Sequence, residues 1–328
     1  MSNHSLNGLN GIREILGKFM LEFVLVILIF VFGFTAPGFF TGDNMLNILR
    51  NVSMQGIIAF SMTLVIISGE IDLSVGSGVA LSGCLLAVIT KALGGRIGFA
   101  LAIAVAILIT LMIGFGIGAL SGLFRIKFRV PTFIATLALM TALSGAANLI
   151  TKGFPITPFP EWFNFFGGGY VLGIPFPAII FIFYFGFMYF IANYTSFGRA
   201  VYAIGGNAEA ARLSGIRVGF VKVMILGLTA LSASLAGILV ASQIMSGTPM
   251  AGKGWEMDVV SAVIIGGVSL QGGSGKMWGT FIGVIFLGII VNGMTLLNVS
   301  EYWQYVVKGL LILCAVLLNQ IQGMKKQG

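Results

Sequence analysis

Residues 98–121, GFALAIAVAILITLMIGFGIGALS, give a clear indication of the fold class of this chain. It carries no charge and exceeds the run of about 20 apolar residues that crosses a hydrocarbon layer of about 30 Å. No water is available inside such a layer, so the backbone groups of a single segment must bond to one another, which a helix achieves. Residues 98–121 therefore predict a transmembrane helix.

Similar apolar runs recur throughout the 328 residues, which are 58% hydrophobic and only 9% charged, whereas soluble domains are about 25% charged. We expect an all-α polytopic integral membrane protein with about ten transmembrane helices. The connections are too short to hold a second domain, so residues 1–328 form one transmembrane domain. The expected spans are residues 19–36, 53–68, 74–90, 98–121, 131–150, 174–193, 222–242, 257–268, 277–295 and 303–320.

The distribution of positive charge predicts the orientation. With the N-terminus in the cytoplasm, the inner connections hold twelve Lys and Arg residues and the outer connections hold five. Cytoplasmic connections are enriched in these residues, so we expect a multi-pass inner-membrane protein with both termini in the cytoplasm. The net charge of +8 reflects this bias and contact with anionic lipid headgroups, and neither zinc-ligand spacing nor a nucleic-acid-binding pattern is found.

Residues 205–216, GGNAEAARLSGI, form a polar segment between two long apolar runs. Asn207 is a favourable N-cap residue, Glu209 places negative charge in the first turn, and Gly215 suits a left-handed C-terminal position. We therefore expect a short helix of about two turns. In the predicted orientation this helix protrudes into the cytoplasm, where it would contact a soluble protein.

The same segment resembles the EAA loop of ABC importer permeases, which docks into the ATP-hydrolysing subunit. Glu209-Ala210-Ala211 is followed after three residues by Gly215, although Ile225 lacks the downstream Pro of the fuller family pattern. The resemblance implies a short cytoplasmic coupling helix. The residues assigned to ATPase coupling are Gly205, Gly206, Asn207, Glu209, Ala210, Ala211, Arg212, Leu213 and Gly215.

Two glycine-rich segments, residues 65–78 and 263–275, resemble each other, since each passes from an apolar run through small polar residues to Gly-Ser-Gly. Six spans separate them, so both face the same side, as a parallel duplication requires. Glycine-interrupted segments in corresponding halves indicate broken helices around a transport path. Tight turns and close helix packing explain the glycines equally well.

Residues 272–277 do not form a nucleotide phosphate loop. That motif requires Gly at position 270 and a hydroxyl at position 277, where Leu270 and Met277 stand. We therefore expect no cofactor on this chain, and an energised transport reaction would require a separate ATPase that uses ATP and Mg.

Seven polar residues in or beside the expected spans are candidates for the translocation path. A charge near the bilayer centre costs about 2.5–3.5 kcal/mol, so such a residue usually faces protein or a water-filled cavity. These candidates are Glu70, Asp72, Asn148, Asp258, Asn292, Gln304 and Lys308.

Each candidate also has a structural interpretation. Asp72, together with Ser74, can cap the third span. Lys308 can extend to the outer surface or pair with Asp258, because both are expected near the outer ends of their spans. The three amide side chains can join neighbouring helices.

Four stretches together resemble the permease subunit of ribose-type ABC sugar importers: residues 44–50, 62–78, 195–199 leading into 205–216, and 266–275. The resemblance implies a second copy of the permease, two cytoplasmic ABC ATPase subunits and an external sugar-binding protein. It also implies a monosaccharide cargo such as ribose, with ATP hydrolysis on a separate chain.

Two other classes of protein remain open. A secondary carrier driven by an ion gradient would also contain broken helices and buried ions, but would not need the coupling helix. A membrane enzyme is disfavoured, because the single His4 lies in the N-terminal tail and no cluster of acid, Cys or Ser residues suggests a catalytic site.

Overall fold

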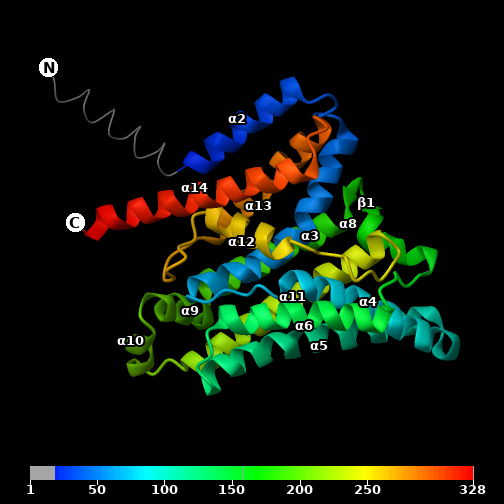
Figure 1. Ribbon diagram of the computed structural model, residues 1–328, viewed down its shortest axis with the longest axis horizontal. Helices are drawn as coiled ribbons and strands as arrows, with labels where there is room; N and C mark the ends of the chain where they lie inside the picture. Colours follow the sequence, from blue (N-terminus) through cyan, green and yellow to red (C-terminus); the bar gives the residue numbers. More distant parts are fainter. Residues whose placement is uncertain (1–18, 158, 328) are drawn as a thin grey trace.

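The computed structural model describes residues 19–157 and 159–327 (Figure 1). These residues form thirteen α-helices, one 3-10 helix and one short hairpin. In chain order the elements are α2 (Met20–Thr35), α3 (Gly42–Ile67), α4 (Val75–Ile97), α5 (Phe99–Lys127), α6 (Thr132–Thr151), η1 (Glu161–Asn164), α7 (Phe165–Gly168), β1 (Tyr170–Val171), β2 (Ile174–Pro175), α8 (Phe176–Tyr194), α9 (Ser196–Gly206), α10 (Ala208–Leu213), α11 (Val218–Gln243), α12 (Trp255–Ile265), α13 (Met277–Leu296) and α14 (Glu301–Gln327).

Among the described residues, seven helices are long and apolar enough to cross a membrane: α3, α4, α5, α6, α8, α11 and α13. A polytopic, helical membrane protein is therefore confirmed. The other three predicted spans coincide with α2, α12 and α14, which are not among the seven. Helix α2 has 16 residues and α12 has 11, so α12 measures only about 16 Å. The number of ten spans stays a prediction.

Helix α3 lies at the centre of the bundle, and 83% of its apolar window is buried. Helix α11 packs against α3, α4 and α5, while α8 and α13 cover other sides of α3 (Figure 1). Helix α6 lies at the periphery, with only 22% of its window buried. Helices α9 and α10 lie at one end of the bundle, which we call the α10 end, and the β1–β2 hairpin lies at the other, the hairpin end.

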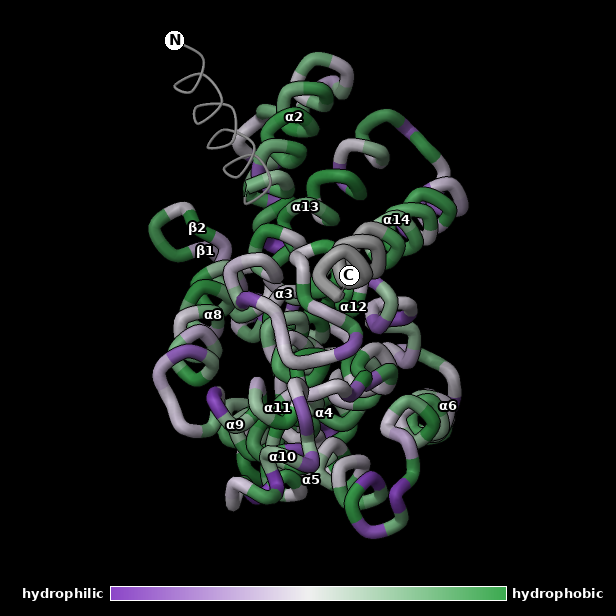
Figure 2. Tube along the Cα trace, turned by 90° about the vertical axis from the view of Figure 1, so that its left-hand side faces the viewer, coloured by the Kyte–Doolittle hydropathy of each residue, from purple (hydrophilic) through white to green (hydrophobic). Residues whose placement is uncertain are grey.

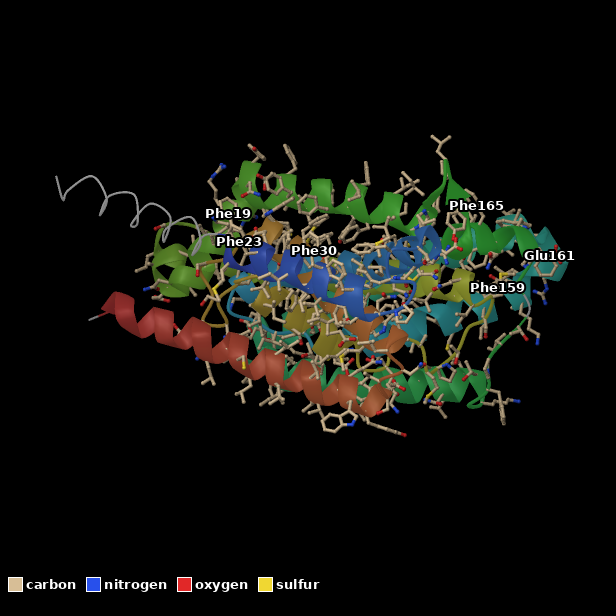
Figure 3. The ribbon with its side chains drawn as sticks, turned by 90° about the horizontal axis from the view of Figure 1, so that it is seen from above. Phe19, Phe23, Phe30, Phe159, Glu161 and Phe165 are labelled. Atoms are coloured by element: carbon tan, nitrogen blue, oxygen red, sulfur yellow. The ribbon has the colours of Figure 1, made fainter. Side chains whose placement is uncertain are left out.

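The surface of the bundle is apolar along its sides. Phe23 and Phe30 on α2 are 47% and 57% exposed, and Figure 3 shows them along that helix. Hydrophobic residues follow α2 and α8, whereas hydrophilic residues gather in connecting segments (Figure 2). This distribution suits a protein whose sides face lipid and whose ends face water.

A row of glycines lets α5 approach α11 closely. Gly114, Gly118 and Gly122 recur every fourth residue, so they lie on one face of α5. A Cβ added to Gly118 would lie only 2.7 Å from the Cβ of Ala230 on α11 and would overlap the backbone of Leu226. Small residues at this spacing are a common means of packing helices in membranes.

The start of α3 and the presence of α9 differ from the sequence prediction. Helix α3 begins at Gly42 rather than near residue 53, because Thr41 caps it by accepting a hydrogen bond from the Asn44 N–H. Helix α9 was not predicted. It begins at another threonine cap, in which Thr195 accepts a hydrogen bond from the N–H of Gly198 at 3.1 Å.

We expect Gly118→Val to destabilise the protein by about 1–3 kcal/mol, because the added carbons force α5 away from α11. Thermal unfolding of the purified protein in detergent measures this. Gly116→Val is the matched control, since a Cβ at Gly116 meets no atom within 4 Å. Equal melting temperatures for the two variants would contradict the packing role of Gly118.

Candidate coupling site

Helix α10 has a capped N-terminus and a glycine just after its C-terminus. The Asn207 side chain accepts hydrogen bonds from the backbone N–H groups of Glu209 (3.0 Å) and Ala210 (2.9 Å). Gly215 follows the helix with a φ of 85°, in the left-handed region that glycine occupies readily. Both termini predicted for this short helix are confirmed.

Most of the α10 surface is exposed. Leu213 is 75% exposed, and the exposed side chains of Glu209 and Arg212 form an ion pair at 2.5 Å. The hydrogen bond from Arg212 holds the pKa of Glu209 below its usual value. Exposed ion pairs contribute little to stability, so these charges do not hold the fold together. Ala211, by contrast, is buried and anchors the helix.

The residue that attaches α10 to the bundle is Gly205, near the end of α9. A Cβ on Gly205 would overlap the carbonyl oxygen of Ile67, the last residue of α3, and the backbone nitrogen of Gly273. The N–H of Gly273 donates to that Ile67 carbonyl at 2.8 Å. Three backbone segments therefore meet without an intervening side chain.

This meeting point joins the two glycine-rich segments that resemble each other in sequence. Residues 68–74 connect α3 to α4, and residues 266–276 connect α12 to α13. Both connections turn at the α10 end, and Gly69 and Gly272 supply the left-handed conformations with φ of 77° and 83°. Their shared side is thus confirmed, but the direct contact with Gly205 was not predicted.

Glu70 lies in the first of these connections and binds three other elements. It accepts hydrogen bonds from Arg125 Nε on α5 at 2.9 Å and from Thr132 Oγ1 on α6 at 2.5 Å. It also forms an ion pair with Lys222 Nζ on α11, and both side chains are nearly buried. We call these four residues the Glu70 cluster.

The Glu70 cluster keeps the carboxylate charged. Burial alone would raise the pKa of Glu70, but the hydrogen bonds from Lys222, Thr132 and Arg125 lower it below its ordinary value of 4.5. The sequence identified Glu70 but not its partners. The sequence did contain a signal for these partners. Arg125 and Lys222 lie at the ends of predicted spans, on the side of the membrane where Glu70 is also expected.

Asp72 is fully buried and stabilises the backbone before α4. Its Oδ1 accepts hydrogen bonds from the N–H of Ser74 at 2.8 Å and from the Ser74 hydroxyl at 2.6 Å. These bonds form a local turn that ends at Ser74, the N-cap position of α4. No side chain caps α4 there, so the predicted capping of this helix by Asp72 and Ser74 is wrong.

The remaining predicted path residues lie apart from α10. Lys308 and Asp258 form the ion pair proposed from the sequence, with a distance of 2.7 Å. Asn292 exchanges hydrogen bonds with Asn44 at 3.0 and 2.7 Å, which joins α13 to α3. Gln304 reaches across a connection to Thr295 on α13 at 3.2 Å, and Asn148 bonds within α6. Their roles in transport stay predictions.

Within residues 19–157 and 159–327, no group of three His, Cys, Asp or Glu side chains is arranged to hold a metal ion.

We expect Glu70→Gln to destabilise the protein by about 3 kcal/mol at pH 7, because Lys222 then stays buried without its counter-ion. The depressed pKa means that the contribution of Glu70 is present above pH 4.5 and is lost as the pH falls through the folded-state pKa. Thermal unfolding in detergent at pH 7 and below pH 4.5 tests both effects.

The variant should therefore lose less stability on acidification than the wild type. Glu209→Gln is the control, since it neutralises an exposed carboxylate that forms an ion pair with Arg212 on the surface. The interpretation is wrong if both substitutions lower the melting temperature at pH 7 by the same amount.

Residues 44–316 match the protein family described as branched-chain amino acid transport system, permease component. The chain is 45% identical to the ribose import permease protein RbsC of Bacillus subtilis (strain 168), over 95% of this chain and 94% of the relative. It is 43% identical to RbsC of Escherichia coli (strain K12), over 90% and 91% of the two chains. Comparison with solved structures found no match.

A third relative, the L-arabinose transport system permease protein AraH of Escherichia coli (strain K12), is 38% identical over 93% of this chain and 90% of its own. The residues matched by the family, 44–316, include α10, both glycine-rich connections and nearly all of the seven apolar helices. This chain therefore belongs to the family of branched-chain amino acid transport system permease components, and it is related over nearly its whole length to bacterial sugar import permeases.

Proposed function

We propose that this chain is the membrane-spanning permease subunit of an ATP-driven importer for ribose or a related monosaccharide. The observation that carries the proposal is the position of α10, a capped and exposed helix whose attachment at Gly205 touches the last residue of α3 and the connection that follows α12. The names of the relatives supply the cargo class.

In this proposal the α10 end faces the cytoplasm and α10 docks into a separate ABC ATPase, which binds ATP and Mg. Leu213 supplies an apolar contact at the centre of the docking surface, and Glu209 and Arg212 supply charges around it. A second copy of the permease and a second ATPase complete the membrane assembly. A sugar-binding protein docks at the hairpin end, and lipid surrounds the apolar sides.

Movement of α10 has two direct routes into the bundle. One passes through Gly205 to the backbone at Ile67 and Gly273, where no flexible side chain absorbs the displacement. The other passes through residues 214–217 into α11, where Lys222 holds Glu70. Both routes reach the connection between α3 and α4, so ATPase movement alters that connection and the access path beside it.

We expect Leu213→Glu to weaken copurification of the ATPase and to abolish ATP-driven uptake, because a charge replaces the exposed apolar contact. The permease should keep its melting temperature, since Leu213 is 75% exposed. Leu172→Glu is the control for copurification of the ATPase, because Leu172 is 98% exposed but lies at the hairpin end, away from α10. Unchanged ATPase binding by the Leu213 variant would contradict the docking role of α10.

Reconstitution distinguishes an ATP-driven importer from a secondary carrier. Proteoliposomes that contain the permease, its ATPase and the sugar-binding protein should accumulate ribose only when ATP is supplied to the ATPase side. An imposed proton or sodium gradient without ATP should have no effect. Uptake that follows the gradient and ignores ATP would instead identify a carrier.

A further inference from the structure

Helix α4 begins inside the bundle rather than at its end. The non-helical residues 70–74 start at Glu70, beside Lys222 in the first turns of α11. Gly78, in the first turn of α4, packs against Ala233 of α11, since a Cβ on Gly78 would lie 3.5 Å from the Ala233 Cβ. Ala233 lies near the middle of α11, which has 26 residues. The N-terminus of α4 is therefore about halfway through the bundle.

Helix α12 also begins inside the bundle, next to α4. Residues 244–254, between α11 and α12, form no helix and return along α4. Gly247 packs against Ala87, whereas Gly252 packs against the carbonyl of Gly76, at 2.9 Å from its added Cβ. Since α12 starts at Trp255, directly after this segment, the N-termini of α4 and α12 lie side by side.

Glu256 occupies the junction of these two helices. A Cβ on Gly76 would overlap the Glu256 carboxylate, so only glycine leaves room for it in the first turn of α4. A carboxylate is favoured there because the N-terminal end of a helix carries partial positive charge.

A cavity of about 410 Å³ opens beside this junction. Its size falls within the range of about 300–1,000 Å³ that small-molecule sites occupy. Ser77 on α4 and Thr141 and Ser144 on α6 contribute hydroxyl groups, while Lys253 and Glu256 contribute one charge of each sign. Thr141 lies in the middle of α6, so the cavity is also about halfway through the bundle.

We propose that this cavity is a transient binding site for a neutral monosaccharide in the translocation path, an inference that rests on the proposed permease function. Serine and threonine hydroxyls both donate and accept hydrogen bonds, as sugar hydroxyls do, and the Glu256 carboxylate accepts them strongly. Met140 and Ala80 add apolar surface for the C–H groups of the sugar ring.

The cavity has the properties of a passage rather than of a tight site. Thr141, Ser144 and Lys253 are exposed, so the cavity is open on one side and does not enclose a sugar completely. The seven polar residues predicted from the sequence for the path do not line it. The hydroxyl groups that line it belong to serine and threonine. These short, uncharged side chains cost little to bury in a membrane helix, so the sequence alone does not distinguish them.

Thiol labelling tests the cavity in the complete complex, with ATPase and sugar-binding protein, in proteoliposomes. Thr141→Cys is introduced after Cys84→Ala and Cys314→Ala remove the native thiols, and the probe is a charged, water-soluble methanethiosulfonate. We expect Thr141→Cys to react and added ribose to slow its reaction severalfold. Ala142→Cys is the matched control, because Ala142 is exposed on the adjacent face of α6 and does not line the cavity.

A second variant narrows the cavity. Ser144→Phe should lower ribose uptake by about tenfold while the ATPase still copurifies and is still stimulated by the loaded sugar-binding protein. Ser144→Cys repeats the labelling one turn away if Thr141→Cys fails to assemble. If the wild-type complex imports ribose with ATP, but ribose protects neither cysteine and Ser144→Phe imports normally, the cavity proposal is wrong and the permease proposal stands. Absence of ATP-driven uptake in the wild type would overturn the permease proposal itself.

Discussion

A peptide group inside a lipid layer must find its hydrogen-bond partner within the protein, and the fold of this chain follows from that requirement. Most of the apolar sequence satisfies this requirement by forming helices, in which the backbone groups bond to one another. The two non-helical segments inside the bundle meet it through side chains and through an isolated β-bridge. The Thr136 hydroxyl accepts a hydrogen bond from the N–H of Leu73 at 3.1 Å. The Asp72 carboxylate accepts a hydrogen bond from the N–H of Ser74. Gly247 exchanges two backbone hydrogen bonds with Ile156.

Small residues make these departures from helix possible. The chain approaches its own backbone at Gly205 and Gly252, where any side chain would collide with a neighbouring segment. The attraction between apolar helices in lipid comes mainly from close packing, because lipid is as apolar as leucine. Glycine therefore serves both the tight α5–α11 contact and the non-helical segments beside α4. Close helix packing explains the first group of glycines, and interrupted helices explain the second.

The proposed working parts form one continuous path of contacts. Helix α10 is attached at Gly205, which touches Ile67 at the end of α3. The connection that carries Glu70 follows Ile67 and leads directly into the N-terminus of α4 beside the cavity. The Glu70 cluster ties the same connection to α5, α6 and α11. Displacement at the surface and the shape of the cavity are thus linked through backbone and buried ion pairs, with few mobile side chains between them.

Local composition, together with caps within a few residues, was enough to predict the membrane class, the approximate positions of the seven long apolar helices and both ends of α10. The sequence also suggested the Lys308–Asp258 ion pair. The partners of Glu70, the contact of Gly205 with Ile67 and Gly273, and the start of α4 and α12 in the middle of the bundle follow only from the folded arrangement of the helices. The physical reason is that apolar helices in lipid carry no strong preference for one neighbour, so their order is set by backbone contacts and buried polar pairs between residues far apart in the chain.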